Sequence, residues 1–284
     1  MSIGFLVAIA LLPAIVLCVY VFKKDSVEKE PVGLLLKLLL FGALSCIPIA
    51  FAEVIVQGII QMFFSEATIA NIGSEFVIRD GAFYLYNFIE YFIGVALIEE
   101  LGKFLIVIWL TRRNKEFNSF FDGLIYCVFV SLGFAALENI MYVFQNGISV
   151  GIMRAILSVP GHMFFGVMMG YFYSIWHITD KAAAVEANLR MQGRIDSSRP
   201  SFSGKDSMRK CLIMPVLAHG LYDFCCVIGT VWAIVLLLAF VIFMYVRCFA
   251  TIKKMSRADA PESNYVYTLV NSKYPGVLYP DEIL

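Results

Sequence analysis

The sequence predicts an all-α membrane protein, a polytopic bundle of about seven transmembrane helices, and three observations support this. The chain has 284 residues, of which 60% are hydrophobic and only 15% are charged, and this composition is too apolar for a soluble domain. About seven stretches reach the roughly 20 apolar residues that a helix needs to cross a bilayer. Basic residues collect in alternate loops, as expected if those loops stay in the cytoplasm.

The predicted spans follow the apolar stretches, with boundaries loose by several residues. They are Ile3–Phe22, Gly33–Phe51, Ala82–Leu110, Phe121–Gln145, Ile152–Ile178, Cys211–Ile228 and Trp232–Phe249. The second apolar run can extend to Phe64. The first run has basic residues after it and none before it, which indicates an anchor rather than a cleavable signal peptide.

The loops predict the orientation of the chain. The loops after the first, third, fifth and seventh spans are rich in Lys and Arg. Loops 65–80 and 146–151 and the turn at Gly229 contain no basic residue other than Arg79. Because Lys and Arg accumulate on the cytoplasmic side, we expect the N-terminus outside and the C-terminus in the cytoplasm. Six or eight spans would break this pattern. The chain is therefore expected to be a multi-pass protein of the cell membrane.

The predicted organisation is a single helical bundle with two polar additions. The bundle covers residues 1–254, with a basic cytosolic loop at 179–210, and residues 255–284 form a cytosolic tail. In the loop we expect a short amphipathic helix over Lys181–Arg194, followed by a flexible segment. The formal charge is near zero and the basic residues serve topology, so the expected partner is the lipid bilayer and not nucleic acid.

Charged residues inside the spans are the clearest functional signal, because a charge in the middle of a spanning helix is costly. The third span contains Glu99, Glu100 and Lys103. Lys103 follows them by four and three residues, so it can neutralise one carboxylate along the helix. A structural ion pair would explain one Glu and one Lys. The doublet, however, leaves an excess negative charge in hydrocarbon.

The fourth span carries Glu138 and Asn139 deep in the apolar run. The Asn139 amide could orient a water or a neighbouring carboxylate, and Gly133 permits another helix to approach closely. Asp122 lies at the predicted cytoplasmic mouth of the same span, where a helix cap is its expected role.

Two histidines lie in the fifth and sixth spans. His162 follows Pro160 and Gly161, and a lone histidine at such a place can be a simple interhelical hydrogen-bond donor. His219 and Asp223 share one helix face at i,i+4. This spacing suits a metal-binding pair or an imidazole held in one tautomer by a carboxylate. A structural hydrogen bond is an equal alternative.

Carboxylates and histidines in a dry cavity can supply the chemistry of peptide-bond hydrolysis. They provide a general base or metal ligands to activate water, and donors for a developing oxyanion. The sequence has no nucleophile elbow, phosphate loop or His-Glu-x-x-His helix. The templates of soluble hydrolases, nucleotide-binding proteins and zincins therefore do not apply.

The order of these residues resembles the PrsW family of intramembrane proteases, within a superfamily that includes CAAX prenyl proteases and bacteriocin-processing enzymes. The matching motifs, on four successive spans within about Tyr91–Cys226, are Glu99-Glu100-x-x-Lys103, Phe134-x-x-x-Glu138-Asn139, His162 and His219-x-x-x-Asp223. The second motif ends in Glu138 where the wider superfamily has histidine, which favours the PrsW branch. The resemblance implies a protease-like core at about 82–228.

The resemblance also implies a substrate and a set of roles. The substrates would be membrane-anchored proteins, such as single-span anti-sigma factors cut near the outer face in a stress response. The implied catalytic residues are Glu99, Glu100, Glu138, His162 and His219, and the implied supporting residues are Lys103, Asn139 and Asp223. Glu99 or Glu100 would activate water. His162, His219 and Asp223 are candidate ligands of a divalent metal such as zinc, and a metal-free glutamate–histidine site is the open alternative.

Two other classes of function are also compatible with buried charges. A proton- or cation-coupled transporter would place Glu, His and Asp near midmembrane as well, although the sequence shows no convincing inverted repeat. A non-catalytic membrane scaffold is the third alternative, but a scaffold would have no evident reason to bury this many charges.

Overall fold

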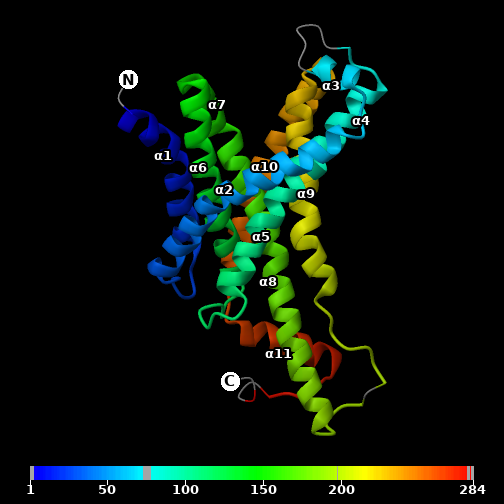
Figure 1. Cartoon of the computed structure of the whole chain (residues 1–284). Coiled ribbons are helices and arrows are strands. Elements are labelled where there is room, and N and C mark those ends of the chain that lie inside the picture. The colour runs from blue at the N-terminus through cyan, green and yellow to red at the C-terminus, as the bar shows by residue number, and fades with distance from the viewer. Residues whose placement is uncertain (1–2, 73–77, 197, 280–281, 283–284) are drawn as a thin grey trace.

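The computed structural model of the chain (Figure 1) is helical throughout its regular parts, as predicted. It describes residues 3–72, 78–196, 198–279 and 282. In chain order, the helices are α1 (Ile3–Lys24), α2 (Val32–Gln61), α3 (Glu66–Ile72), α4 (Gly81–Ile89), the π-helix η1 (Glu90–Leu97), α5 (Ile98–Thr111), α6 (Asp122–Asn146), α7 (Ile148–Ile156), α8 (Ser158–Met191), α9 (Lys205–Ile228), α10 (Val231–Arg257) and α11 (Glu262–Lys273). Apart from these, the described residues form one isolated bridge, between Ser119 and Pro261.

Helix α6 is the central element of the bundle. In its most apolar window 78% of the residues are buried, compared with 22% in α1 and in α10. It packs against α1, α2 and α8, and small residues permit these contacts. A Cβ added to Gly133 of α6 would overlap the backbone of Leu39 in α2, and one added to Gly42 of α2 would overlap Val130 in α6. The backbones of α2 and α6 therefore touch at two glycines.

Six helical segments of the described residues are long and apolar enough to span a membrane. They correspond to six of the predicted spans. The predicted span Ala82–Leu110 differs, because it is formed by α4, η1 and α5 in one continuous helical run. Its middle is π-helical at Glu90–Leu97, so none of the three pieces is long enough alone. This run is the counterpart of the remaining predicted span, and the number of crossings stays a prediction.

The predicted span Ile152–Ile178 is also interrupted. Helix α7 ends at Ile156, and α8 starts at Ser158. Pro160 explains the break, since proline has no N–H to donate to the carbonyl four residues earlier and its ring crowds that carbonyl. This carbonyl belongs to Ile156, and it accepts a hydrogen bond from the Tyr245 hydroxyl of α10 instead.

Helix α8 continues far beyond the predicted end of its span. The separate amphipathic helix expected over Lys181–Arg194 was wrong, because α8 runs unbroken to Met191. The sequence between Thr179 and Met191 contains no proline or glycine that would end a helix, and it is rich in alanine, a strong helix former.

Helix α11 packs on this extension of α8, and we call the two together the tail module. Its apolar contacts join Ile178 and Leu189 of α8 to Val266 and Val270 of α11. The Glu186 carboxylate of α8 accepts hydrogen bonds from the side chains of Arg190, Lys273 and Tyr274. The tail is thus a folded addition to α8.

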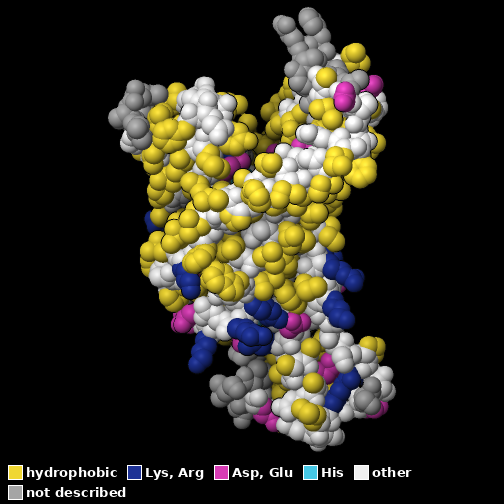
Figure 2. Space-filling view, in the orientation of Figure 1, with side chains coloured by type: hydrophobic (Ala, Val, Ile, Leu, Met, Phe, Trp, Pro, Cys, Tyr) yellow, Lys and Arg dark blue, Asp and Glu magenta, His cyan; other side chains and the backbone are white. Residues whose placement is uncertain are grey.

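A second polar contact joins the two helices of the tail module near the bundle. Glu262 accepts hydrogen bonds from His177 and Lys181. Burial raises the pKa of the Glu262 carboxyl, but these hydrogen bonds outweigh burial and hold this pKa below its usual value. Figure 2 shows Lys and Arg gathered between the broad apolar band and this module, as expected for the cytoplasmic edge of a membrane protein.

The close contact between α2 and α6 yields a stability prediction. Gly42→Ala is expected to lower the free energy of unfolding by about 1–3 kcal/mol, because the added methyl meets the Val130 backbone, which cannot move aside. Thermal unfolding of the purified protein in detergent measures this. Gly58→Ala is the matched control, because Gly58 lies in the same helix with open space around it. Equal unfolding temperatures for both variants would contradict the packing described here.

Candidate active site

A cavity of about 650 Å³ lies between α2, η1, α5, α6, α7, α8 and α9. The functional residues predicted from the motifs gather along its wall, among them Glu99, Glu138, His162, His219 and Asp223. Figure 2 shows the molecule hollowed between the part that holds α6 and α7 and the part that holds α4 and α9, on the side opposite α11. Acidic side chains are visible at the bottom of this hollow.

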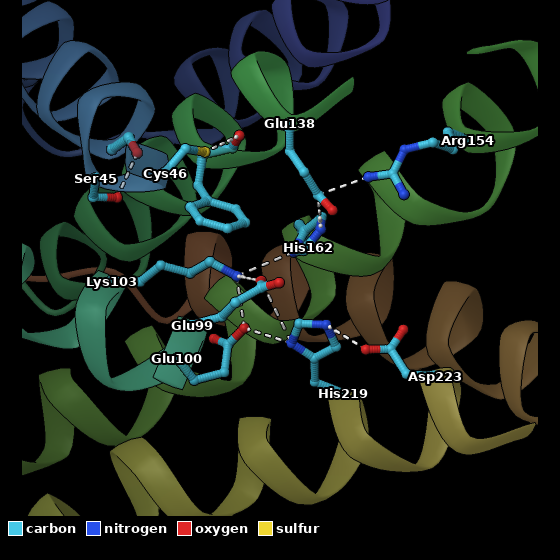
Figure 3. A network of polar contacts seen from close by, with 12 residues as sticks. Ser45, Cys46, Glu99, Glu100, Lys103, Glu138, Arg154, His162, His219 and Asp223 are labelled. Carbon is cyan, nitrogen blue, oxygen red and sulfur yellow. Dashed lines mark hydrogen bonds and ion pairs between the residues drawn. The ribbon is translucent and has the colours of Figure 1, made fainter. Parts of the chain in front are cut away.

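Lys103 lies at the centre of the polar cluster (Figure 3). Its Nζ atom is 2.9 Å from Glu99 Oε2 and 2.8 Å from Glu100 Oε1. The side chains of Lys103 and Glu100 are fully buried. The Lys103 ammonium also lies 4.1 Å from the centroid of the Phe134 ring, a cation–π contact. One ammonium therefore contacts both carboxylates of the doublet, rather than one of them.

His162 links Lys103 to the carboxylate of the fourth span. Its Nδ1 atom is 3.2 Å from Lys103 Nζ. An ammonium only donates, so Nδ1 accepts and Nε2 carries the hydrogen. Nε2 donates to Glu138 Oε2 at 2.9 Å, and the same oxygen pairs with Arg154 at 2.7 Å. Glu138 is thus held between an imidazole and a guanidinium (Figure 3).

His219 lies between two carboxylates. Its Nδ1 atom is 3.0 Å from Glu100 Oε1, and its Nε2 atom is 3.1 Å from Asp223 Oδ2. Since both ring nitrogens face acceptors, the imidazolium form satisfies both contacts. The ring stacks on Phe165, with centroids 4.7 Å apart, and its centroid lies 5.3 Å from that of His162.

The two histidines are oriented alike. Each Nε2 contacts a carboxylate, Glu138 for His162 and Asp223 for His219, and each Nδ1 faces the centre of the cluster. Histidines that bind metals usually donate their second ring nitrogen in this way, which fixes the tautomer and the ring orientation. The arrangement presents two Nδ1 atoms to a common point.

The cluster has the chemistry of a cation site. Glu99, Glu100, His162 and His219 each offer a ligand atom, and these four atoms lie within 4.8 Å of one another. The second oxygen of Glu100, Oε2, is buried without a hydrogen-bond partner among the described residues. Carboxylate and imidazole are common ligands of divalent zinc. The Lys103 ammonium already contacts three of the four residues, which shows that this point accommodates positive charge.

Helix geometry explains why the residues meet. The spacing of three and four residues brings both carboxylates of α5 to Lys103. Glycines let the neighbouring helices approach: a Cβ on Gly166 of α8 would crowd Ser131 in α6, and one on Gly220 of α9 would overlap the Phe92 ring of η1. The cluster therefore forms where four helical segments pack closely.

Most of the residues singled out in the sequence lie together in this network, namely Glu99, Glu100, Lys103, Glu138, His162, His219 and Asp223. Asn139 lies elsewhere, because its side-chain amide donates to the Ala10 carbonyl and joins α6 to α1. Asp122 does not have the expected capping role: its carboxylate accepts hydrogen bonds from the backbone of Asn118 and Ser119, which precede α6, and the N-cap residue is Phe121. Asp223 contacts His219 and is outside the group of four ligand residues.

Two residues of the site were missed by sequence reasoning. Arg154 lies near the start of the predicted span Ile152–Ile178, where an arginine is expected at the membrane interface, but it pairs with Glu138. Glu53 lies just beyond Phe51, the predicted end of the second span, where it is also expected at the interface, whereas α2 continues past it and Glu53 lines the cavity. Its Oε1 atom is buried without a hydrogen-bond partner among the described residues. The extension of the apolar run to Phe64 was the signal that places Glu53 inside the span.

Comparisons with known proteins identify the family of the chain. The family model of the PrsW family intramembrane metalloproteases matches residues 30–247. Protease PrsW of Oceanobacillus iheyensis is 30% identical over 212 residues, covering 75% of this chain and 78% of that protein. Protease PrsW of Clostridioides difficile is 29% identical, covering 84% and 85%, and that of Bacillus subtilis is 26% identical, covering 84% and 90%.

No solved structure gives a significant match to the chain. The family model covers most of the bundle, from just before α2 into α10, including every residue of the cluster. The chain therefore belongs to the PrsW family of intramembrane metalloproteases, and it is a multi-pass membrane protein and a protease.

Proposed function

We propose that the chain cleaves membrane-anchored proteins within the cavity, close to the outer face of the membrane. The observation that carries this is the position of the cavity. Its wall includes Ser149 near the start of α7 and Val227 near the end of α9. Both lie at helix ends away from the basic loops, so in the predicted topology the cavity faces outward.

A single-span protein is the substrate class that fits this cavity best. A peptide bond inside an intact helix is shielded by the helix, so the cut segment must be extended. The ends of helices fray more readily than their middles, and an outward-facing cavity would receive the outer end of a substrate span. Single-span anti-sigma factors, expected from the sequence resemblance, are one such class.

Glu99 is our proposed general base. It lines the cavity, whereas Glu100 is fully buried outside the lining. Lys103 holds Glu99 in position at 2.9 Å. A carboxylate so placed can accept a proton from a water that attacks the scissile carbonyl. Glu100 contacts both Lys103 and His219 and is a candidate metal ligand rather than the base.

A divalent metal, with zinc as the first choice, fits the centre of the cluster. His162 and His219 would hold it through Nδ1, together with Glu100, whose Oε2 atom has no partner among the described residues. Such an ion supplies Lewis-acid polarisation of the scissile carbonyl. Glu138 and Asp223 keep the two imidazoles in the required orientation.

The proteolytic role of Glu99 is tested by comparing protein N-termini in membranes from cells with wild-type chain or Glu99→Gln at matched levels. New termini near the spans of other membrane proteins are expected with wild type only, because the variant lacks the base. Glu66→Gln, a change of an exposed carboxylate in α3, is the matched control and should resemble wild type. Identical profiles for all three, in the natural host under an inducing stress, would contradict the proposal and identify no substrate.

Metal dependence is tested on the purified protein by elemental analysis and chelation. About one zinc per chain is expected, and His162→Ala and His219→Ala should each lose it. Asp223→Asn should weaken binding about 10–100-fold, because it removes the carboxylate that orients His219. Full cleavage of the identified substrate after complete metal removal would instead support the metal-free glutamate–histidine site.

The Arg154–Glu138 pair yields a third prediction. Arg154→Gln should lower kcat/KM for the substrate about 10–100-fold, because Glu138 loses the cation that fixes it beside His162. Arg154→Lys should restore part of the activity through its charge. Activity equal to wild type in Arg154→Gln would show that the pair has no part in the reaction.

A further inference from the structure

A second cavity lies in the half of the bundle nearest the tail module, and it shares no lining residue with the proposed active site. It has a volume of about 580 Å³ and is bounded by α8, α9, α10 and α11. Its walls are mostly apolar and aromatic, with Phe164 and Phe172 from α8, Phe243 from α10 and Tyr265 from α11. We call it the α8–α10 groove. A cavity of this size accommodates part of an elongated apolar molecule.

Two cations lie along one wall of the α8–α10 groove. Arg247 and Lys254 both belong to α10, with Thr251 between them. Their spacing of four and three residues puts all three on one helix face, over about 10 Å. Arg247 and Lys254 are exposed. Neither side chain has an ion pair or hydrogen bond within the described part of the chain, and the groove lining contains no carboxylate there.

This charge distinguishes the α8–α10 groove from other lipid-facing hollows. A groove of about 320 Å³ between α1 and α2 is lined by apolar side chains such as Leu11, Ile15 and Leu36, with no charged residue among the described ones. Any lipid chain can fill that hollow. In the α8–α10 groove, two unpaired cations are combined with aromatic walls, which is the chemistry that an anionic amphiphile requires.

We propose that the α8–α10 groove binds one anionic phospholipid of the cytoplasmic leaflet. Its phosphate and headgroup lie against Arg247 and Lys254, where the Thr251 hydroxyl can also donate. The first part of an acyl chain follows the aromatic wall of α8. Basic residues between helices at the cytoplasmic edge attract anionic lipids, at about 1 kcal/mol for each Lys or Arg near the surface.

The lipid would join the membrane bundle to the tail module. Tyr265 belongs to α11, and Phe120, in the loop before α6, contacts it with ring centroids 4.8 Å apart. Both residues line the groove. A phospholipid in this place therefore touches the bundle and α11 at the same time. A soluble phosphate would occupy only the cationic end of the groove. It has no apolar part that could pack against the aromatic wall.

The test is native mass spectrometry of the full chain, released from nanodiscs of mixed phosphatidylcholine and phosphatidylglycerol. Wild type is expected to retain phosphatidylglycerol in preference to phosphatidylcholine. Arg247→Gln/Lys254→Gln should lower this preference roughly tenfold or more, from two lost contacts of about 1 kcal/mol each. Thr251→Trp, which fills the groove and keeps both charges, should lower it as well.

The matched control is Arg113→Gln/Lys115→Gln. It also removes one Arg and one Lys that are exposed at the same predicted edge of the bundle. It should bind as wild type does, and all variants are compared after size-exclusion chromatography and thermal unfolding. An equal loss in the control, or no loss in either groove variant, would overturn the proposal. Displacement of phosphatidylglycerol by free glycerol phosphate would assign the groove to a soluble phosphate instead.

Discussion

A lysine buried between two carboxylates is the interaction on which the architecture of this protein depends. Lys103 and Glu100 are fully buried, and removing one partner of such a group leaves an uncompensated charge that costs about 3–5 kcal/mol. Glycines support the approach of the histidines to this group, because Gly166 lets α8 pack closely on α6 and Gly220 lets α9 pack closely on η1. Arg154 and Asp223 then fix the outer ends of the same network. Helix packing and the chemistry of the site are thus set together.

The fold was largely predictable from the sequence, because a membrane helix needs a long apolar run and this chain has such runs in order. The interruptions were harder to predict. A π-helix such as η1 has no composition signal of its own. The continuation of α8 to Met191 agrees with its local sequence, which has no helix breaker, but the packing of α11 on it joins residues distant in the sequence. Apolar length predicts spans, whereas contacts between distant segments are not visible in it.

The residues of the site were predictable as a set, since charged residues in apolar spans are rare and usually mark a functional site. Their partners were harder to identify. Arg154 has the position of a residue at the membrane interface, but it belongs to the short helix α7 before the break at Leu157 and pairs with Glu138. Asn139, adjacent to Glu138 in sequence, faces α1, because neighbouring residues of a helix point in different directions. Membership of the protease family decides against the transporter that the same charges allowed.

The Lys103 ammonium at the centre of the cluster affects the order in which the protein folds and binds a metal. In small zinc domains, the protein folds only when the ion binds, because the ligands are not held together without it. Here the Lys103 ammonium, which belongs to the chain, already contacts both carboxylates. If the cluster holds a metal as proposed, the bundle can therefore assemble before the ion binds.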